Sequence, residues 1–432
     1  MSQPPSRTTP SAPTESMIGE FASLPAGDVD DCVDGRGMRP VFQPIVSLED
    51  GSTVGFEALA RWTRLDDPCL EAVFAYAAST GHAHQLERTC IRAAIAHALR
   101  AQLDPGTPLF INCEATTPCL RRADDELLAR GSDHLQLVFE ITERSLLAHP
   151  QALLAKITAL RADGFAVALD DVGAHLDSLA MLDVVAPDVI KLDLALVQSH
   201  PRYQQARAWA AILDHHERAG ALILAEGIET TEHIQRARSL GATLGQGFLF
   251  GHPSPFDAHH PTRTAAALRI GTQRPLVDLE SPFDVVAARA PRRVERKDTV
   301  LALSRYLEQQ ALQARDAPMV LAALQRREFF RGATRRVYHQ LAAASPLVAV
   351  FGDGVSADLG AGVRGVSFTP DDPLAAQWIV LILGATNAAA LVAREHDAGT
   401  HLLDADRRFD TVITNDRTLV TKVAHTLLSR MV

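Results

Sequence analysis

The stretch FAVALDDVGAHLDSL, residues 165–179, runs from a strand-like apolar segment directly into two adjacent carboxylates, Asp170 and Asp171. Neighbouring carboxylates repel each other and are costly to remove from water. The end of this strand must therefore supply something that makes the pair tolerable: a shared proton, a cluster of basic groups or a divalent metal.

The same pattern recurs from residue 41 to about residue 256, where short apolar runs end in polar residues and helix-like segments follow. The eight runs are VFQPIV, TVGFEALAR, LFINCE, LQLVFEITE, FAVALDD, VIKLD, LILAEGIE and ATLGQGFLF. Strands that mostly alternate with helices predict an α/β fold, a (β/α)8 barrel of the TIM type. A doubly wound open sheet is the alternative, but no glycine-rich phosphate loop follows the first run.

The length of 432 residues and the changes in composition predict more than one domain. Residues 1–37 are rich in Pro, Ser and Thr and lack the apolar segment of a secretory signal, so we expect a disordered tail there. We place the barrel over 38–257 and a linker, beginning near HPSPFDAHHPTRT, over 258–280. A smaller α/β or α+β domain follows over 281–432. No apolar run is long enough to span a bilayer.

The cysteines and the charge narrow the class of protein. An odd number of cysteines without a C-x-x-C pair argues against structural zinc or disulfides and predicts a cytoplasmic protein; they are Cys32, Cys69, Cys90, Cys113 and Cys119. The net charge of −10 is uneven, since residues 281–432 hold 19 Lys and Arg against 16 Asp and Glu. Neither part is basic enough to predict DNA binding. An acidic barrel that handles an anionic ligand needs local positive charge, most simply metal ions.

Polar residues at the strand ends would meet on one face of the barrel. They are Glu57, Asn112, Glu140, Asp170, Asp171, Lys191, Glu226 and Gln246. Taken singly, such residues are more often helix caps or solvated charges. Together, carboxylates and an amide oxygen form a ligand set that suits Mg²⁺ or Mn²⁺ far better than zinc or copper.

This ligand set suggests chemistry at phosphorus. Asp170 and Asp171 are suited to serve two ions, which activate a water and stabilise the attacking and leaving oxygens of an in-line displacement. Lys191 is suited to orient that water or to neutralise developing charge. Arg61 is suited to donate a forked pair of hydrogen bonds to a phosphate.

The ordered blocks resemble the EAL domain, the cyclic di-GMP phosphodiesterase module. The signature stands as Glu57-Ala58-Leu59-Ala60-Arg61 after FQPIV, and the further blocks are IN, FEITE, LDD, IKLD, AEGIE and GQGFLF. The resemblance covers about residues 38–257 and implies a barrel with one antiparallel strand. It also implies hydrolysis of one phosphodiester of cyclic di-GMP to linear pGpG, and often a homodimer formed near the loop after the paired aspartates.

The resemblance further implies roles for individual residues. One metal would be held by Glu57, Asn112, Glu140 and Asp170, and the second by Asp170, Asp171 and Glu226. The catalytic network would comprise Lys191, Glu226, Gln246 and Glu143, of which Glu143 anchors the loop after the aspartates. Contacts with the dinucleotide are expected from Gln43, Leu59, Arg61, Asp193, Glu229 and Phe248.

The loop after the aspartates departs from the family pattern D-D-F-G-(T/A)-(G/A)-(Y/F)-S-S-L. Val172 replaces the usual Phe, while His175 and Leu176 replace a small residue and an aromatic one. The departure bears on turnover more than on binding. The alternative function is therefore a weak or inactive EAL receptor that binds cyclic di-GMP or a protein partner, although such receptors usually lose ligands that this chain keeps. Hydrolysis of a different dinucleotide also stays open.

The region from Ser281 onward resembles the DICT sensory domain, on SPFDVV, QWIVLILG, domain order and size. Helices are expected in 298–315, 327–344 and 417–432, and strands in SPLVAVFG, VRGVSF, QWIVLILG, AALVAREH and FDTVITND. The resemblance implies regulation by an effector or a protein partner. The basic runs APRRVERK and QRREFFRGATRR are typical of solvated helix faces, with an anionic effector as the alternative.

Overall fold

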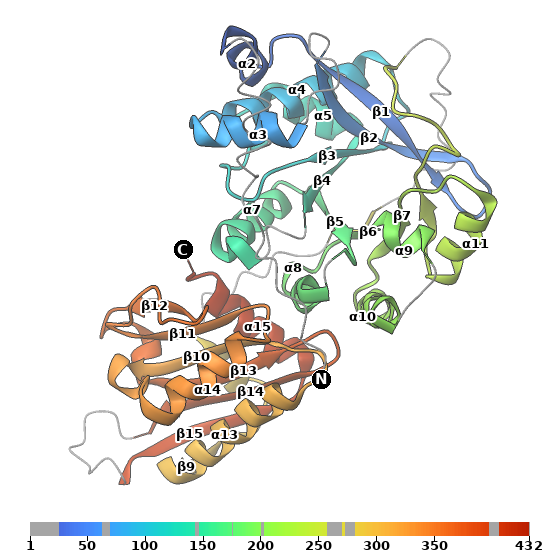
Figure 1. Ribbon diagram of the computed structural model, residues 1–432. Helices are drawn as coiled ribbons and strands as arrows, with labels where there is room; N and C mark the ends of the chain where they lie inside the picture. Colours follow the sequence, from blue (N-terminus) through green and yellow to red (C-terminus); the bar gives the residue numbers. More distant parts are fainter. Residues whose placement is uncertain are drawn as a thin grey trace, which may run out of the picture.

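The computed structural model describes residues 26–62, 70–142, 147–174, 176–199, 203–256, 270–272, 281–396 and 406–431. A closed barrel forms the first part of the chain, and a unit built on one open sheet forms the second (Figure 1). No helix in these ranges combines the length and the apolar character that crossing a membrane requires.

All eight predicted runs supply one barrel strand each. The strands are β1 (Met38–Ser47), β2 (Thr53–Trp62), β3 (Pro108–Asn112), β4 (Gln136–Thr142), β5 (Ala166–Val172), β6 (Val189–Leu192), β7 (Leu222–Ala225) and β8 (Leu244–Gly245). They close in sequence order, and β1 runs antiparallel to both of its neighbours, β2 and β8. The other neighbouring strands are parallel. The predicted α/β barrel with one antiparallel strand is therefore confirmed.

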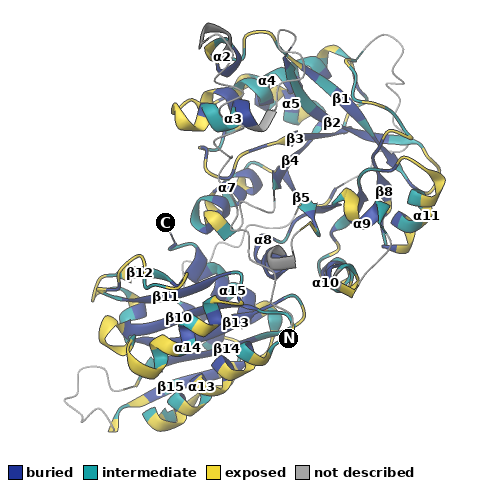
Figure 2. Ribbon diagram, in the orientation of Figure 1, coloured by how far each residue is buried: buried dark blue, intermediate teal, exposed yellow. Residues whose placement is uncertain are grey.

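Helices cover the outside of the barrel, so its strands are buried on both faces (Figure 2). They are α3 (Leu70–Ser79), α4 (Ala83–Arg100), α5 (Glu126–His134), α7 (Pro150–Ala162), α8 (Leu182–Val185), α9 (Leu194–Gln198), α10 (Tyr203–Ala219) and α11 (Thr231–Ser239), with the 3-10 turn η1 (Leu176–Met181). Side-chain caps fix several helix starts: Asp125 accepts from the backbone of Leu127 and Leu128, and Thr230 accepts from that of His233.

The disordered tail predicted for residues 1–37 extends too far, because residues 26–33 form helix α2 (Ala26–Val33). The end of this helix carries apolar residues that pack on the barrel, which the Pro, Ser and Thr content of the tail did not indicate. Cys32 and Val33 are buried against Trp62 and Leu86, and the indole of Trp62 donates a hydrogen bond of 3.1 Å to the carbonyl of Cys32.

Most of the predicted linker, 258–280, lies outside the described residues, but Ile270 is fixed. Its side chain packs among residues of the barrel interior, including Ile45 and Phe110. Its backbone also exchanges two hydrogen bonds with the side-chain amide of Gln136, at 2.6 and 3.1 Å. The chain is thus attached to the first residue of β4 before the second unit begins.

The second unit is a seven-stranded mixed sheet in the order β12-β11-β10-β13-β14-β15-β9. Its strands are β9 (Arg293–Arg296), β10 (Met319–Arg326), β11 (Val348–Asp353), β12 (Arg364–Phe368), β13 (Gln377–Leu383), β14 (Ala388–Glu395) and β15 (Arg408–Thr414). Only β10–β11 and β11–β12 are parallel pairs. The expectation of an α/β or α+β unit is confirmed, but β9 and the central strand β10 were not predicted.

Helices cover both faces of this sheet. They are α12 (Pro282–Ala287), α13 (Lys297–Gln313), α14 (Gly332–Ala342) and α15 (Arg417–Leu428), with the short turns η2 (Arg327–Phe329) and η3 (Pro373–Ala376). Strand β13 separates two cores, because alternate residues point to opposite faces. Val380 and Ile382 pack in the cluster that includes α13 and α14, whereas Ile379 and Leu381 pack in the one that includes α12 and α15.

Helix α15 joins the two units, because it contacts α7 and α8 of the barrel as well as its own sheet. Buried side chains of α8, such as Leu182 and Val185, belong to the same continuous apolar cluster as Val420 and Leu427 of α15. An ion pair between Arg207 of α10 and Asp316 adds a second point of contact. The second unit therefore rests on the helices that lie outside β4, β5 and β6.

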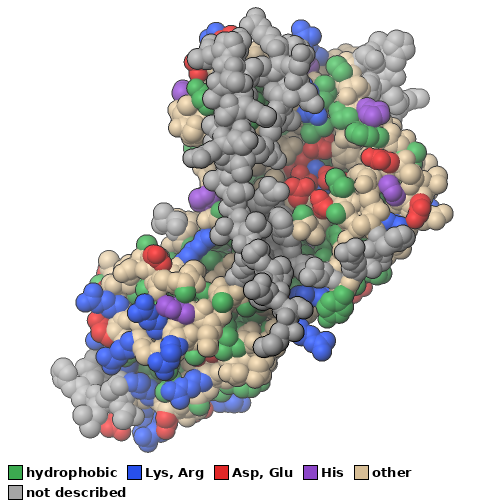
Figure 3. All heavy atoms as spheres, viewed as in Figure 1, with side chains coloured by type: hydrophobic (Ala, Val, Ile, Leu, Met, Phe, Trp, Pro, Cys, Tyr) green, Lys and Arg blue, Asp and Glu red, His purple; other side chains and the backbone are tan. Residues whose placement is uncertain are grey.

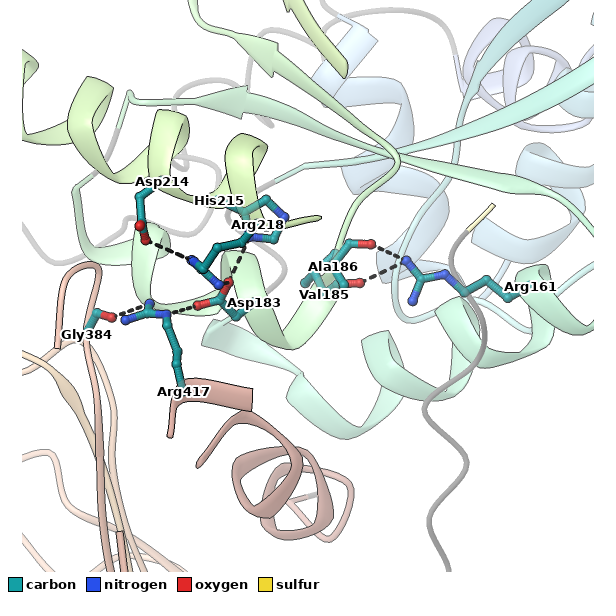
Figure 4. A network of polar contacts seen from close by, with 9 residues as sticks. All are labelled: Arg161, Asp183, Val185, Ala186, Asp214, His215, Arg218, Gly384 and Arg417. Atoms are coloured by element: carbon teal, nitrogen blue, oxygen red, sulfur yellow. Dashed lines mark hydrogen bonds and ion pairs between the residues drawn. The ribbon is translucent and has the colours of Figure 1, made fainter. Parts of the chain in front are cut away.

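A buried carboxylate, Asp183, lies at the centre of this interface (Figure 4). Arg417 of α15 donates to one of its oxygens, and Arg218 Nη1 and His215 Nδ1 each lie 2.8 Å from the other. Arg417 also donates a 2.7 Å hydrogen bond to the carbonyl of Gly384. Burial opposes the ionisation of Asp183, but the His215 hydrogen bond and the charges of Arg417 and Arg218 outweigh it and hold the pKa well below its usual value.

Candidate functional site

Lys191 lies at the centre of the site, at the carboxyl end of β6, and its side chain is 1% exposed. Its ammonium nitrogen is 2.8 Å from a carboxylate oxygen of Glu226, 2.9 Å from Glu140, 3.1 Å from Asp170 and 3.6 Å from Glu57. Figure 3 shows acidic side chains gathered in a hollow of the barrel. The strand ends thus bring the predicted carboxylates together, as the barrel interpretation requires.

A chain of side-chain hydrogen bonds fixes Glu57 in the middle of β2 (Thr53–Trp62). The amide nitrogen of Gln246 donates to Glu57 Oε2 at 2.6 Å and lies 2.9 Å from Gln43 Oε1. Gln43 in turn donates to the carbonyl of Gly251 at 3.2 Å, and Asn112 donates to Glu57 Oε1 at 3.3 Å. Gln43, Asn112 and Gln246 therefore hold the glutamate in one orientation.

The paired aspartates share one site because β5 is irregular where they occur. In a regular strand, adjacent side chains would point to opposite faces. The register between β5 and β6 shifts between Leu169 and Val172, and Asp171 has a positive φ of 58°. As a result, carboxylate oxygens of Asp170, Asp171 and Glu226 all lie within 4.8 Å of one another.

The loop after the aspartates is anchored at its start. Val172 is 1% exposed, so it fills an interior position. Gly173 has a φ of +102°, and a Cβ atom there would lie 2.2 Å from the side chain of Leu196. His175 lies outside the described residues, as does Glu143, so the roles expected of them stay predictions.

The electrostatics of the site are unbalanced, because several carboxylates surround one ammonium. Burial and the charge of Glu57 raise the pKa of Glu140 well above its usual value. Burial, opposed by Lys191, raises the pKa of Glu226 to about 8. Burial disfavours the charged form of Lys191, yet the surrounding carboxylates raise its pKa well above the usual value. If only bound protons neutralise these carboxylates, keeping them buried side by side costs considerable free energy.

The donor chemistry fits divalent metal ions. Glu140 Oε2 and Gln246 Oε1 are buried side-chain oxygens that have no hydrogen-bond partner among the described residues. Such atoms are rare unless an ion or water satisfies them. An all-oxygen set of several carboxylates suits Mg²⁺, Mn²⁺ or Ca²⁺, and added positive charge would relieve the repulsion.

The remaining predicted residues lie around this centre in different situations. Arg61 is half-buried in β2 and donates to the carbonyl of Ala60 at 2.7 Å. Leu59 of the same strand is half-buried. Asp193 caps α9 by accepting from the backbone of Ala195 at 2.8 Å, which gives it a structural role. Glu229 is exposed just before α11.

Phe248 lies in the segment after β8 and is 54% exposed. Its ring stacks on that of His252, with centroids 4.2 Å apart. An exposed aromatic pair is a surface on which a nucleobase can stack.

Sequence reasoning missed Asp183, the acid at the interface between the units. A signal was present, because Asp183 interrupts the apolar run LAMLDVV. An acid within such a run is buried, and a buried acid requires basic partners. Two of the partners come from α10, and the third comes from α15, which lies more than two hundred residues further along the chain. No local pattern identifies any of them.

Comparison with known proteins places both parts of the chain. Residues 27–253 match the model of the EAL domain, and residues 284–396 match that of the "Sensory domain in DIguanylate Cyclases and Two-component system". The cyclic di-GMP phosphodiesterase RocR of Pseudomonas aeruginosa is 32% identical over 55% of this chain and 62% of its own length. The probable cyclic di-GMP phosphodiesterase PdeB of Escherichia coli is 29% identical over 52% of this chain and 44% of its own.

The chain therefore spans about half the length of the curated relatives it matches. Among solved structures, the PaMucR phosphodiesterase in complex with c-di-GMP aligns with a TM-score of 0.45 and 26% identity, over 53% of this chain and 96% of that one. The family model covers more than half of the present chain, from α2 to the segment after β8. The chain belongs to the EAL domain family.

Proposed function

We propose that this chain is a metal-dependent phosphodiesterase that hydrolyses cyclic di-GMP to linear pGpG. The observation that carries the proposal is the Lys191-centred group of carboxylates at the carboxyl ends of the barrel strands. The similarity to the cyclic di-GMP phosphodiesterase RocR and to the probable cyclic di-GMP phosphodiesterase PdeB supports the same substrate.

Two divalent ions, Mg²⁺ or Mn²⁺, belong to the proposal. One would be held by Glu57, Asn112, Glu140 and Asp170, and the other by Asp170, Asp171 and Glu226. When bound, such ions supply Lewis acidity and a water that loses its proton near neutral pH.

The chain's own residues account for positioning. Lys191 presents a buried ammonium beside the carboxylates, where it can orient the attacking water or stabilise the negative charge that develops on phosphate. Gln246 and Gln43 keep Glu57 in place through their hydrogen bonds. Arg61 has no ion-pair partner among the described residues, so its guanidinium is available for a phosphate oxygen. Phe248 offers its exposed ring to a guanine base.

Regulation by the second unit, taken to span residues 281–432 beyond the linker 258–280, is part of the same proposal. Helix α15 packs on α8, and Asp183 of α8 lies only twelve residues after Asp171. The segment that leaves the paired aspartates is therefore held at its far end by Arg417. A change in the position of α15 would alter the support of the loop that follows both aspartates.

The test is turnover by the full-length chain with Mn²⁺ and cyclic di-GMP, with nucleotide products separated by chromatography. We expect pGpG to appear, and to disappear when EDTA is added. A calorimetric titration with cyclic di-GMP runs alongside. Folded protein that binds cyclic di-GMP and yields no pGpG would end the enzyme proposal and favour the receptor function instead.

A further inference from the structure

The second unit contains a cavity of about 670 Å³ between α13, α14 and the sheet. It lies on the face of the sheet opposite to the one on which α15 meets the barrel. Its apolar wall comprises Leu301, Leu312, Leu324, Phe329, Val337 and Trp378. A volume of this size matches small organic ligands, and it is too small for a folded partner.

Basic groups border the same cavity. Arg305 of α13 and Arg331, just before α14, both line it and are exposed to solvent. Neither has an ion-pair partner among the residues that the structure describes. Figure 3 shows many further basic side chains on the second unit, and Lys297 and Arg407 also line the cavity. The acid in the lining is Glu308, and burial raises its pKa to about 7, so the basic groups outweigh it and favour an anion.

Backbone strain also marks the wall of the cavity. Gln325, on the cavity wall, is 5% exposed and has a φ of +63°, a conformation that is costly for this residue. The strain falls where the register between β10 and β11 shifts, and strained backbone gathers at functional sites.

We propose that this cavity is an effector site for an organic anion with a flat apolar body. The negative group binds Arg305 and Arg331 at the mouth, and the apolar body lies between Leu324 and Trp378. Binding here is separate from catalysis, so a failure of this proposal leaves the phosphodiesterase proposal untouched.

The probe is 1-anilinonaphthalene-8-sulfonate, titrated into the full-length chain and followed by its fluorescence. N-phenyl-1-naphthylamine has the same rings without the sulfonate, and it isolates the contribution of charge. We expect the sulfonate to bind at least about tenfold more tightly, since a charge-assisted hydrogen bond is worth about that factor. Equal or tighter binding of the uncharged probe to the wild-type chain would overturn the proposal.

Variants locate the bound probe. We expect the double substitution Arg305→Ala and Arg331→Ala to weaken the sulfonate roughly tenfold or more and to leave the uncharged probe unchanged. Thr334→Trp, which fills the half-buried cavity wall at α14, should abolish the binding of both probes. Arg336→Ala is the matched control, because Arg336 is an exposed arginine of α14 outside the cavity lining.

Wild-type affinity for the sulfonate in the double variant, or in Thr334→Trp, would also overturn the proposal. Circular dichroism and thermal melting establish that each variant is folded before its titration is interpreted. If a variant does not fold, the comparison of the two probes in the wild-type chain still decides the outcome.

Discussion

Two buried charged clusters in this molecule have opposite compositions. In the barrel, the single ammonium of Lys191 faces carboxylates from Glu57, Glu140, Asp170 and Glu226. At the interface between the units, the single carboxylate of Asp183 faces His215, Arg218 and Arg417. The first cluster has an excess of acids and the second an excess of bases, yet only the first calls for an additional ion.

The difference lies in access to other partners. Arg218 also pairs with the exposed Asp214 at 2.9 Å, and Arg417 also donates to the carbonyl of Gly384, so both arginines are shared with other acceptors. Among the residues that the structure describes, Glu57, Glu140, Asp170 and Glu226 have no second basic group of this kind. The pKa of Glu226 accordingly rises to about 8, while the pKa of Asp183 falls. An excess of charge therefore indicates a binding site only where neighbouring groups do not compensate it.

The largest expected effect tests the functional side of this comparison. Asp170→Asn removes one carboxylate of the metal set, so turnover of cyclic di-GMP should fall by a factor of about a thousand or more, or roughly 4 kcal/mol of transition-state stabilisation. Rates are measured by chromatography of pGpG.

Glu57→Ala should behave in the same way towards turnover. Glu49→Gln is the control, since Glu49 is an exposed acid in the turn between β1 and β2. Near-wild-type turnover in Asp170→Asn or Glu57→Ala would refute the assignment of the site.

The next effect concerns the interface. Asp183→Asn leaves three basic groups without their shared carboxylate, and breaking a buried pair in this way costs roughly 3 kcal/mol of unfolding free energy. Urea unfolding measures the loss. Asp214→Asn is the matched control, because its side chain is 50% exposed and surface ion pairs contribute about 0–1 kcal/mol.

The same variant tests regulation. If the second unit regulates the barrel, turnover by Asp183→Asn should differ from wild type while Asp214→Asn matches it. Identical rates for all three proteins would remove regulation through this contact from the proposed function.

The smallest effect is a pH dependence at the interface. Because the folded-state pKa of Asp183 lies below its usual value of 3.8, its stabilising contribution is complete above that value and is lost as the pH falls through the folded pKa. The difference in unfolding free energy between wild type and Asp183→Asn, measured downward from pH 5, should thus narrow below about pH 4. A difference that stays constant as the pH falls from 5 to 2 would contradict the assignment.

The sequence was sufficient for the barrel because each strand end carries a polar residue that the apolar run before it makes conspicuous, as in VIKLD. It could not predict that β5 is irregular, since the left-handed Asp171 follows from tertiary packing and not from local preference. Strand β10 was missed because MVLAALQR is buried on both faces and has no alternation to set it apart from the helices around it. The Arg417–Asp183 contact joins positions 234 residues apart, beyond any local pattern.

Strand β13 connects the proposed effector cavity to the contact between the second unit and the barrel. Trp378, near its start, borders the cavity, and Gly384, directly after its end, binds the arginine that reaches Asp183. The strand is paired on both sides, with β10 and β14, so it moves as a stiff rod together with the sheet. At about 3.3 Å per residue, that rod is roughly 20 Å long. If a ligand at the Trp378 indole tilted β13, the other end of the strand would displace Arg417 at the barrel. This consequence would not depend on the chemical identity of the ligand.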